Sequence, residues 1–155
     1  MKKMLVIAGL ILSSCTEASA PDPIPTAPVV TTPDPVGEVQ YFGQLKVTDG
    51  KLTDSTGEAV MLRGVSFGWH NWWPRFYNTS AVKYLKSDWN ANMVRAAMGV
   101  DPADAYLENP EFAIGKIKAV VDAAIAEDMY VIIDWHSHDL YPEQAKAFFI
   151  EMAQT

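Results

Sequence analysis

The sequence contains one cysteine, Cys15, among its 155 residues, so no disulfide can form within the chain. A small domain held together by disulfides is therefore excluded. Runs of basic residues are also missing. The 12 Lys and Arg residues are outnumbered by 19 Asp and Glu residues, which gives a net charge of −7. An acidic chain without a basic patch has little attraction for nucleic acid, and we expect no nucleic-acid partner.

Glycine-rich nucleotide motifs are absent as well. Neither the G-x-G-x-x-G pattern nor a Walker pattern follows any apolar segment, which argues against a nucleotide site. The apolar run Met4–Leu12 is too short to span a bilayer and follows Lys2 and Lys3. This combination is typical of a secretory signal peptide.

We expect the signal peptide to occupy residues 1–20, and two ends are compatible with the sequence. Leu12–Cys15 resembles a bacterial lipobox, which would make Cys15 the lipidated first residue of the mature protein, whereas Ala18–Ala20 resembles an A-x-A cleavage site. We favour the lipobox because the only cysteine follows the apolar run closely. The expected location is outside the cytoplasm, as a membrane-anchored lipoprotein of the periplasm or cell surface, or as a secreted protein if cleavage follows Ala20.

Residues 21–37 form a predicted spacer. Six of the ten prolines fall between Pro21 and Pro35, among Thr, Ala and Asp. This composition favours extended polyproline II over a packed core, and behind a lipid anchor it would hold a domain away from the membrane. A proline-rich ligand for a partner is the alternative, although no basic residues flank a PxxP motif.

Residues 38–155 form the predicted globular domain. Asp49-Gly50 and Ser55–Gly57 separate short alternating runs and indicate a hairpin and a turn. Strands and helices then alternate: the expected strands are Ala59–Ser66, Asn92–Met98 and Met129–His136, and the expected helices cover about 80–89, a segment from Pro110 and a segment from Pro142. Thr79 or Ser80 is the expected cap of the first of these helices and Asn109 that of the second. Helical spacing predicts that these residues face inward: Val82, Leu85 and Trp89; Ile114, Ile117, Val121, Ala124 and Ile125; Ala145, Phe148, Phe149 and Met152.

Repeated strand–helix units predict an α/β fold with a parallel sheet and right-handed crossovers. Apolar strands followed by amphipathic helices fit either a doubly wound sheet or a (β/α)₈ barrel. Both folds carry functional residues at the carboxyl ends of their strands. Polar and aromatic residues gather there in this sequence: Trp69, His70, Asn71, Trp72 and Trp73 after the first strand, Arg95 in the second, and Asp134, Trp135, His136 and His138 at the end of the third.

Three interpretations of these residues compete. His136 and His138 alternate along a strand and, with His70, are compatible with a metal site, although two nearby histidines are a weak signal. The "GWHNWW" segment is compatible with a sugar-binding face that has no catalytic role. A glycosidase is the third interpretation, because indole rings stack on sugars while His, Arg and Asn bind hydroxyls and carboxylates. For any single Trp, simple packing is the ordinary alternative.

Four segments in order decide between these interpretations: "GQLKVTDGKLTDSTGEAVMLRGVS", "VRAAM", "YVIIDWH" and "EQAKAFFIEMA". Together they resemble the N-terminal part of a glycoside hydrolase family 5 endoglucanase, a cellulase, from about Tyr41 onward. The resemblance implies about three βα units of a (β/α)₈ TIM barrel. It also implies retaining hydrolysis of internal β-1,4-glucan bonds by a monomer, with a β-glucan polysaccharide as substrate and no metal or organic cofactor.

The resemblance also implies roles for individual residues. Arg95 matches the family arginine beside the nucleophilic glutamate, where its positive charge keeps that carboxylate ionised. His136 matches the histidine that binds sugar at the point of cleavage, and Trp72 falls at a sugar-stacking Trp. Trp69, Trp73 and His70 are further expected substrate-binding residues. The ordinary alternatives are a structural ion pair for Arg95 and a core imidazole for His136.

Some positions depart from the family pattern. An ungapped match places Gly68 where many relatives have a cleft histidine, and His70 lies two positions further on. Gly99 stands where many relatives have Tyr. His138 has no counterpart, so we interpret it as an exposed loop residue.

The two catalytic carboxylates are expected to be missing. A retaining glycosidase uses a pair about 5–5.5 Å apart, and the resemblance implies glutamates at the ends of the fourth and seventh strands. Residues 38–155 are fewer than the roughly 250 of a whole barrel, and neither Asp134 nor Glu108 suits either role. We therefore expect an inactive fragment of a glycosidase, with a lipid-anchored, non-catalytic glycan-binding protein as the alternative.

Overall fold

The computed structural model describes residues 37–154. The predicted signal peptide, Cys15 and the spacer apart from Gly37 lie outside the described residues. Within residues 37–154, no helix is long and apolar enough to cross a membrane.

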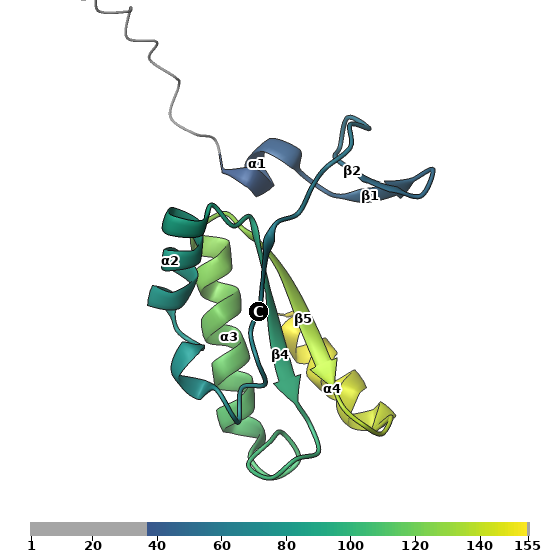
Figure 1. Cartoon of the computed structure of the whole chain (residues 1–155). Coiled ribbons are helices and arrows are strands. Elements are labelled where there is room, and N and C mark those ends of the chain that lie inside the picture. Colours follow the sequence, from purple (N-terminus) through teal and green to yellow (C-terminus); the bar gives the residue numbers. More distant parts are fainter. Residues whose placement is uncertain (1–36, 155) are drawn as a thin grey trace, which may run out of the picture. The chain divides into compact units, whose positions relative to one another are not determined.

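The described part begins with a short helix and a hairpin (Figure 1). Helix α1 (Glu38–Phe42), which the sequence did not predict, precedes β1 (Lys46–Thr48) and β2 (Lys51–Thr53), which pair antiparallel. Asp49 and Gly50 between them have φ angles of 51° and 72°. Two consecutive positive φ values are the signature of a type I′ turn, so the predicted hairpin is confirmed.

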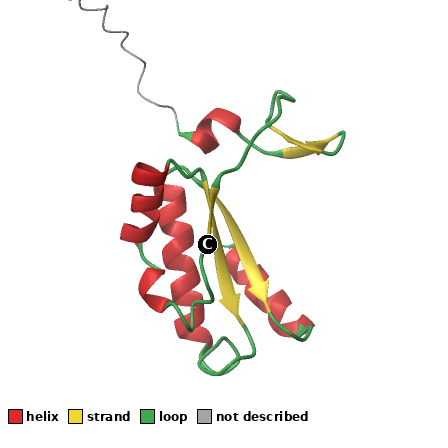
Figure 2. Ribbon diagram, viewed as in Figure 1, coloured by secondary structure: helices red, strands yellow, loops and turns green. Residues whose placement is uncertain are grey.

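Three parallel strands form the second sheet, in the order β3 (Gly64–Ser66), β4 (Met93–Gly99), β5 (Tyr130–His136). Figure 2 shows β4 and β5 pointing the same way. The two longer strands match their predicted ranges, but the first is shorter than expected. Its predicted beginning bonds to the hairpin instead, because Ala59 bridges Thr53 and the Val60 N–H donates to the Leu52 carbonyl.

The predicted helices are α2 (Thr79–Trp89), α3 (Pro110–Ala126) and α4 (Pro142–Met152), and a 3₁₀ turn, η1 (Pro74–Phe76), precedes the first. The cap of α2 is Asn78 and not Thr79 or Ser80, because Asn78 Oδ1 accepts the Ala81 N–H at 3.0 Å. Asn109 occupies the cap position of α3 as predicted, but its side chain makes no capping bond.

The sheet has two chemically different faces. Side chains alternate along each strand, and the face toward the helices is apolar: Val65, Val94, Ala96, Met98, Val131, Ile133 and Trp135 pack in the core. Among the helical residues, Val82, Ile117 and Phe148 are buried against it. The opposite face carries the intervening residues: Ser66, Arg95, Ala97, Ile132, Asp134 and His136.

Three residues predicted to face inward are exposed instead: Trp89, Ile125 and Phe149. Trp89 is the last residue of α2, is 62% exposed, and lines an apolar cavity of ≈ 700 Å³ between that helix and β3. Helical spacing predicts which residues share one face of a helix, but not how much of that face the neighbouring elements cover. The three wrong predictions lie at the margins of the predicted apolar stripes.

Candidate functional site

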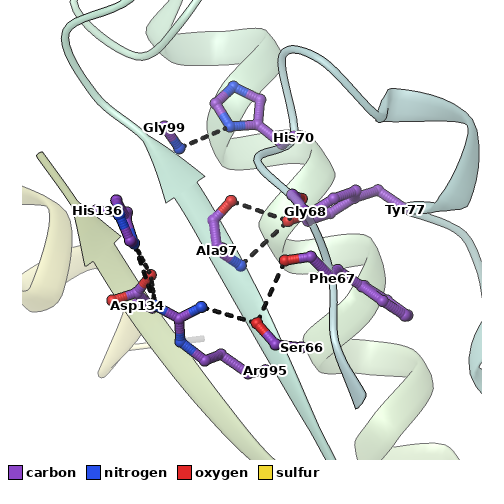
Figure 3. A network of polar contacts seen from close by, with 10 residues as sticks. All are labelled: Ser66, Phe67, Gly68, His70, Tyr77, Arg95, Ala97, Gly99, Asp134 and His136. Carbon is purple, nitrogen blue, oxygen red and sulfur yellow. Dashed lines mark hydrogen bonds and ion pairs between the residues drawn. The ribbon is translucent and has the colours of Figure 1, made fainter.

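A polar network joins the three parallel strands (Figure 3). It includes Ser66 and His136, the last residues of β3 and β5, and Arg95, the third residue of β4. Arg95 on β4 donates from Nη1 to Ser66 Oγ on β3 at 2.7 Å and from Nη2 to Asp134 Oδ2 on β5. Asp134 Oδ2 also lies 3.1 Å from Nδ1 of His136. The strand register makes these contacts possible, because Ser66 pairs with Arg95 and Asp134 lies two residues beyond the Arg95 partner, Ile132.

The hydrogen-bonding role of His136 depends on its tautomer. A guanidinium is always a donor and an ionised carboxylate is always an acceptor, and His136 Nδ1 lies 3.1 Å from both Arg95 Nη2 and Asp134 Oδ2. A protonated Nδ1 donates to Asp134 and leaves a lone pair on Nε2, whereas an unprotonated Nδ1 accepts from Arg95 and leaves a proton on Nε2. Either tautomer leaves Nε2 of His136, a partly exposed residue, able to form a hydrogen bond with a ligand.

The segment after β3 is fastened to β4 by Tyr77. The Tyr77 hydroxyl lies 2.7 Å from the Gly68 carbonyl and 2.8 Å from the Ala97 carbonyl, and it accepts the Ala97 N–H at 3.1 Å. Burial raises the pKa of this phenol, so it stays neutral. Because Tyr77 is 1% exposed, its hydroxyl does not contact a ligand. Its hydrogen bonds fix the start of the Trp-containing loop, residues 67–73.

Four rings gather beside the network. Trp69 stacks on Trp72 with ring centroids 4.7 Å apart and an interplanar angle of 22°, and it contacts His136 at 4.7 Å and His138 at 5.6 Å. Trp69 is thus surrounded by other rings, whereas Trp72 is 61% exposed. Of the two, Trp72 presents the open ring face on which a sugar can stack.

His70 lies apart from these rings, although it is adjacent to Trp69 in the sequence. It is completely buried, and its Nδ1 accepts the Gly99 N–H at 3.2 Å. Burial, helped by the positive charge of Lys116, lowers its pKa to about 4. In this structure the imidazole is a neutral part of the interior, and its contact with substrate stays a prediction.

The two glycines that depart from the family pattern make room for the Trp-containing loop. A Cβ at Gly68 would lie 2.4 Å from the Trp73 ring, and one at Gly99 would lie 2.5 Å from the Asn71 amide oxygen and 3.3 Å from Trp69. The space that larger side chains would occupy is therefore filled by the loop itself.

Trp73, like His70, is a predicted binding residue that lies outside the ring cluster of Trp69, Trp72, His136 and His138. Its indole lines the apolar cavity between β3 and α2, near Phe76 and below the guanidinium of Arg75. The structure thus groups Trp69 and Trp72 with His136 and His138, while Trp73 faces the neighbouring helix.

His138 is held in place rather than mobile on its loop. Its backbone N–H and its Nδ1 lie 3.0 Å from the two carboxylate oxygens of Asp101, which follows β4. Although partial burial opposes the effect, these two bonds hold the pKa of Asp101 below its ordinary value. Sequence reasoning missed Asp101, Ser66 and Tyr77, because each contacts a residue far away in the sequence and no local pattern marks such a contact.

The three histidines take different partners, which bears on the metal interpretation. His70 bonds to Gly99, His136 to Asp134 and His138 to Asp101. Among the residues that the structure describes, no group of three or more His, Cys, Asp or Glu could hold a metal ion.

The comparisons with known proteins agree on one family. A family model described as cellulase (glycosyl hydrolase family 5) matches residues 53–155. The chain is 43% identical over 119 residues to an endoglucanase of Clostridium saccharobutylicum, which covers 74% of this chain and 26% of that protein. It is 42% identical over 120 residues to endoglucanase N of Pectobacterium atrosepticum, with 74% and 27% covered.

Solved structures agree with this family. A structure from Cytophaga hutchinsonii has a TM-score of 0.71 at 46% identity and covers 74% of this chain and 38% of its own. The catalytic domain of a Thermobifida fusca endoglucanase, solved with cellotetraose, has a TM-score of 0.68 at 32% identity and covers 77% and 40%. The chain spans about a quarter of the length of the curated relatives it matches.

Proposed function

The chain belongs to the cellulase family, glycosyl hydrolase family 5, and we propose that it is the N-terminal part of a retaining endo-β-1,4-glucanase. The predicted fold class is confirmed at this level: the three parallel βα units form part of a (β/α)₈ barrel. The observation that carries the proposed activity is the network of Ser66, Arg95, Asp134 and His136, which reaches the carboxyl ends of β3 and β5. Active sites of such barrels lie at this end.

The residues of the network and the rings beside it supply what binding a glucan needs. The exposed face of Trp72 suits the apolar C–H face of a glucose unit, and Nε2 of His136 can form a hydrogen bond with a sugar hydroxyl. Both side chains are fixed by neighbours, Trp72 by Trp69 and His136 by Asp134. Preorganised groups of this kind bind without losing much conformational freedom.

Arg95 supplies a permanent positive charge on the face of the sheet that points away from the helices. Ser66 and Asp134 fix the direction of its guanidinium. We propose that this charge keeps the nucleophilic glutamate of the enzyme ionised, as the family resemblance implies. Replacing the guanidinium of Arg95 by a lysine ammonium would keep the charge but lose the simultaneous hydrogen bonds to Ser66 and Asp134.

We further propose that residues 37–154 do not themselves supply the acid/base and nucleophile. Asp134 is engaged by Arg95 and His136, and Glu108 accepts the Asp104 N–H within its own loop at 2.9 Å. Both carboxylates therefore have structural partners, and retaining hydrolysis requires a free pair facing the glycosidic bond.

The test uses the complete gene product that carries this sequence. We expect it to release reducing ends from soluble β-1,4-glucan, with products that keep the β configuration when followed by NMR. Arg95→Lys should lower kcat/KM by roughly two orders of magnitude, in the range expected when a hydrogen bond to a charged group is lost. Arg63→Lys is the matched control, because Arg63 is exposed and bonds to Asn92 through its backbone.

If the protein binds glucan without cleaving it, the second candidate function is favoured, a lipid-anchored glycan-binding protein. The exposed indole of Trp72 is the observation that supports this candidate. The anchor itself is a proposal from the sequence alone. A Cys15→Ala variant should move the protein from the membrane fraction to the soluble one, and an unchanged distribution would argue against lipidation.

A further inference from the structure

We propose that His138, oriented by Asp101, is a specificity-determining residue that binds a glucose unit remote from the bond being cleaved. This inference rests on the proposed glucanase function and extends its binding surface by one position. It departs from the interpretation of His138 as an ordinary exposed loop residue.

The contact between His138 and Asp101 fixes both the backbone and the ring. Asp101 Oδ2 accepts the His138 N–H and Oδ1 accepts from Nδ1, each at 3.0 Å. The Asp101 side chain is 13% exposed, while that of His138 is 72% exposed. A largely buried carboxylate thus holds an imidazole that projects into solvent, and its rotation is restricted before any ligand arrives.

The contact with Asp101 also determines whether Nε2 of His138 donates or accepts a hydrogen bond. An ionised Asp101 can accept a hydrogen bond from Nδ1 only if that nitrogen carries a proton, so the neutral ring has its lone pair on Nε2. No hydrogen bond to that nitrogen exists within residues 37–154. A hydroxyl that donates to Nε2 is the complementary ligand, and a glucan presents hydroxyls along its whole length.

The position of His138 places it beside the ring cluster. Trp69 meets His138 edge-on at 5.6 Å and stacks on Trp72 at 4.7 Å. Rings therefore continue from the open face of Trp72 through Trp69 to His138. A ring face next to a fixed hydrogen-bonding group is the combination that recognises a sugar, because it matches both the apolar face and the hydroxyl edge.

His138 and His136 should contact different sugar units. His136 belongs to the network around Arg95, and the ring of Trp69 contacts both imidazoles. His138 bonds instead to the loop that follows β4. Its effect on catalysis should therefore depend on whether the substrate is long enough to reach it.

The experiment measures kcat and KM of the complete gene product on cello-oligosaccharides of increasing length. For His138→Ala we expect KM to rise about three- to tenfold on long substrates, the effect of losing one hydrogen bond. kcat should stay unchanged, and short substrates should show no difference from the parent. His138→Gln should recover part of the loss, because its amide can bond to a hydroxyl at a similar reach.

Two further variants separate orientation from packing. Asp101→Asn keeps the side-chain size but turns an amide NH₂ toward one of the His138 donors, so it should weaken binding beyond the same substrate length. Asp139→Asn changes an exposed residue of the same loop and should behave as the parent.

The outcomes distinguish the inference from the function on which it rests. If the parent hydrolyses glucan and His138→Ala matches Asp139→Asn at every substrate length, the inference is wrong and the glucanase stands. An equal loss at every length, or a loss in kcat alone, would show that His138 supports the fold or the reacting bond and would also overturn it. If the parent neither cleaves nor binds any β-glucan, both proposals fail.

Discussion

At the scale of single residues, His70 and His138 carry the same side chain in opposite surroundings. The first is enclosed and accepts the Gly99 N–H, while the second is exposed and bonded to Asp101. Both are imidazoles in loops after strands, so only their neighbours separate their roles.

The burial of His70 predicts how stability depends on pH. Its folded-state pKa of about 4 lies below the ordinary value of 6.5, so between these values the unfolded chain binds a proton that the folded chain does not. Stability should therefore fall as pH falls from 6.5 to 4, by on the order of 3 kcal/mol at the lower end. Denaturant unfolding of the complete gene product at pH 7, 5.5 and 4 measures this slope.

His70→Asn is the diagnostic variant, because its amide oxygen can still accept the Gly99 N–H but does not titrate. It should flatten the slope even if it lowers stability at every pH, whereas His138→Ala should leave the slope as it is. Equal slopes in the parent and in His70→Asn would show that His70 is not the group responsible.

At the scale of elements, hydrogen bonds at helix ends decide the boundaries that hydrophobic spacing leaves open. Two asparagines occupy the cap positions of α2 and α3, but only Asn78 uses its side chain as a cap. Its oxygen accepts the Ala81 N–H, while Asn109 is followed by Pro110, which has no N–H to satisfy.

This difference makes the two asparagines a matched pair. Asn78→Ala should lower the free energy of unfolding by about 1 kcal/mol, the usual cost of removing a side-chain cap. Asn109→Ala removes the same atoms without removing a cap bond and should cost clearly less. Thermal and denaturant unfolding of the complete gene product provide the comparison, and equal losses would argue against the capping assignment.

At the scale of the whole molecule, the three-stranded sheet is covered on one face only. The helices pack against the apolar face, while Ile132 on the opposite face is 46% exposed. Within the described residues, β3 and β5 form the two edges of the sheet. Parallel sheets are normally buried on both faces, and open edges favour association with other strands.

We therefore predict that the 155-residue chain expressed by itself neither unfolds cooperatively nor hydrolyses glucan. The complete gene product should do both, because a closed barrel covers the exposed face and supplies the carboxylate pair. Differential scanning calorimetry and a reducing-sugar assay on the two proteins make the comparison. A sharp thermal transition together with hydrolysis by the shorter chain would contradict the prediction.

The sequence by itself determined the order of the hairpin and the strand–helix units, the parallel sheet and the family. Period-two and helical spacing are local properties, and Asp49-Gly50 specifies a turn without help from elsewhere. The same reasoning brought Arg95, His136 and Trp72 to one end of the sheet, because parallel strands share their carboxyl edge. The sequence could not reveal that Trp89 would be exposed or that Asn78 would cap α2.

Only the tertiary structure decided which of these residues contact and orient one another. The contacts of Arg95 with Ser66 and Asp134 join residues 29 and 39 positions apart, and the contact of Asp101 with His138 joins residues 37 positions apart. Such pairs depend on strand register and loop path, which arise from packing of the whole domain and leave no trace in local spacing. A histidine acquires its role from the partner that fixes its ring, and that partner is a property of the fold.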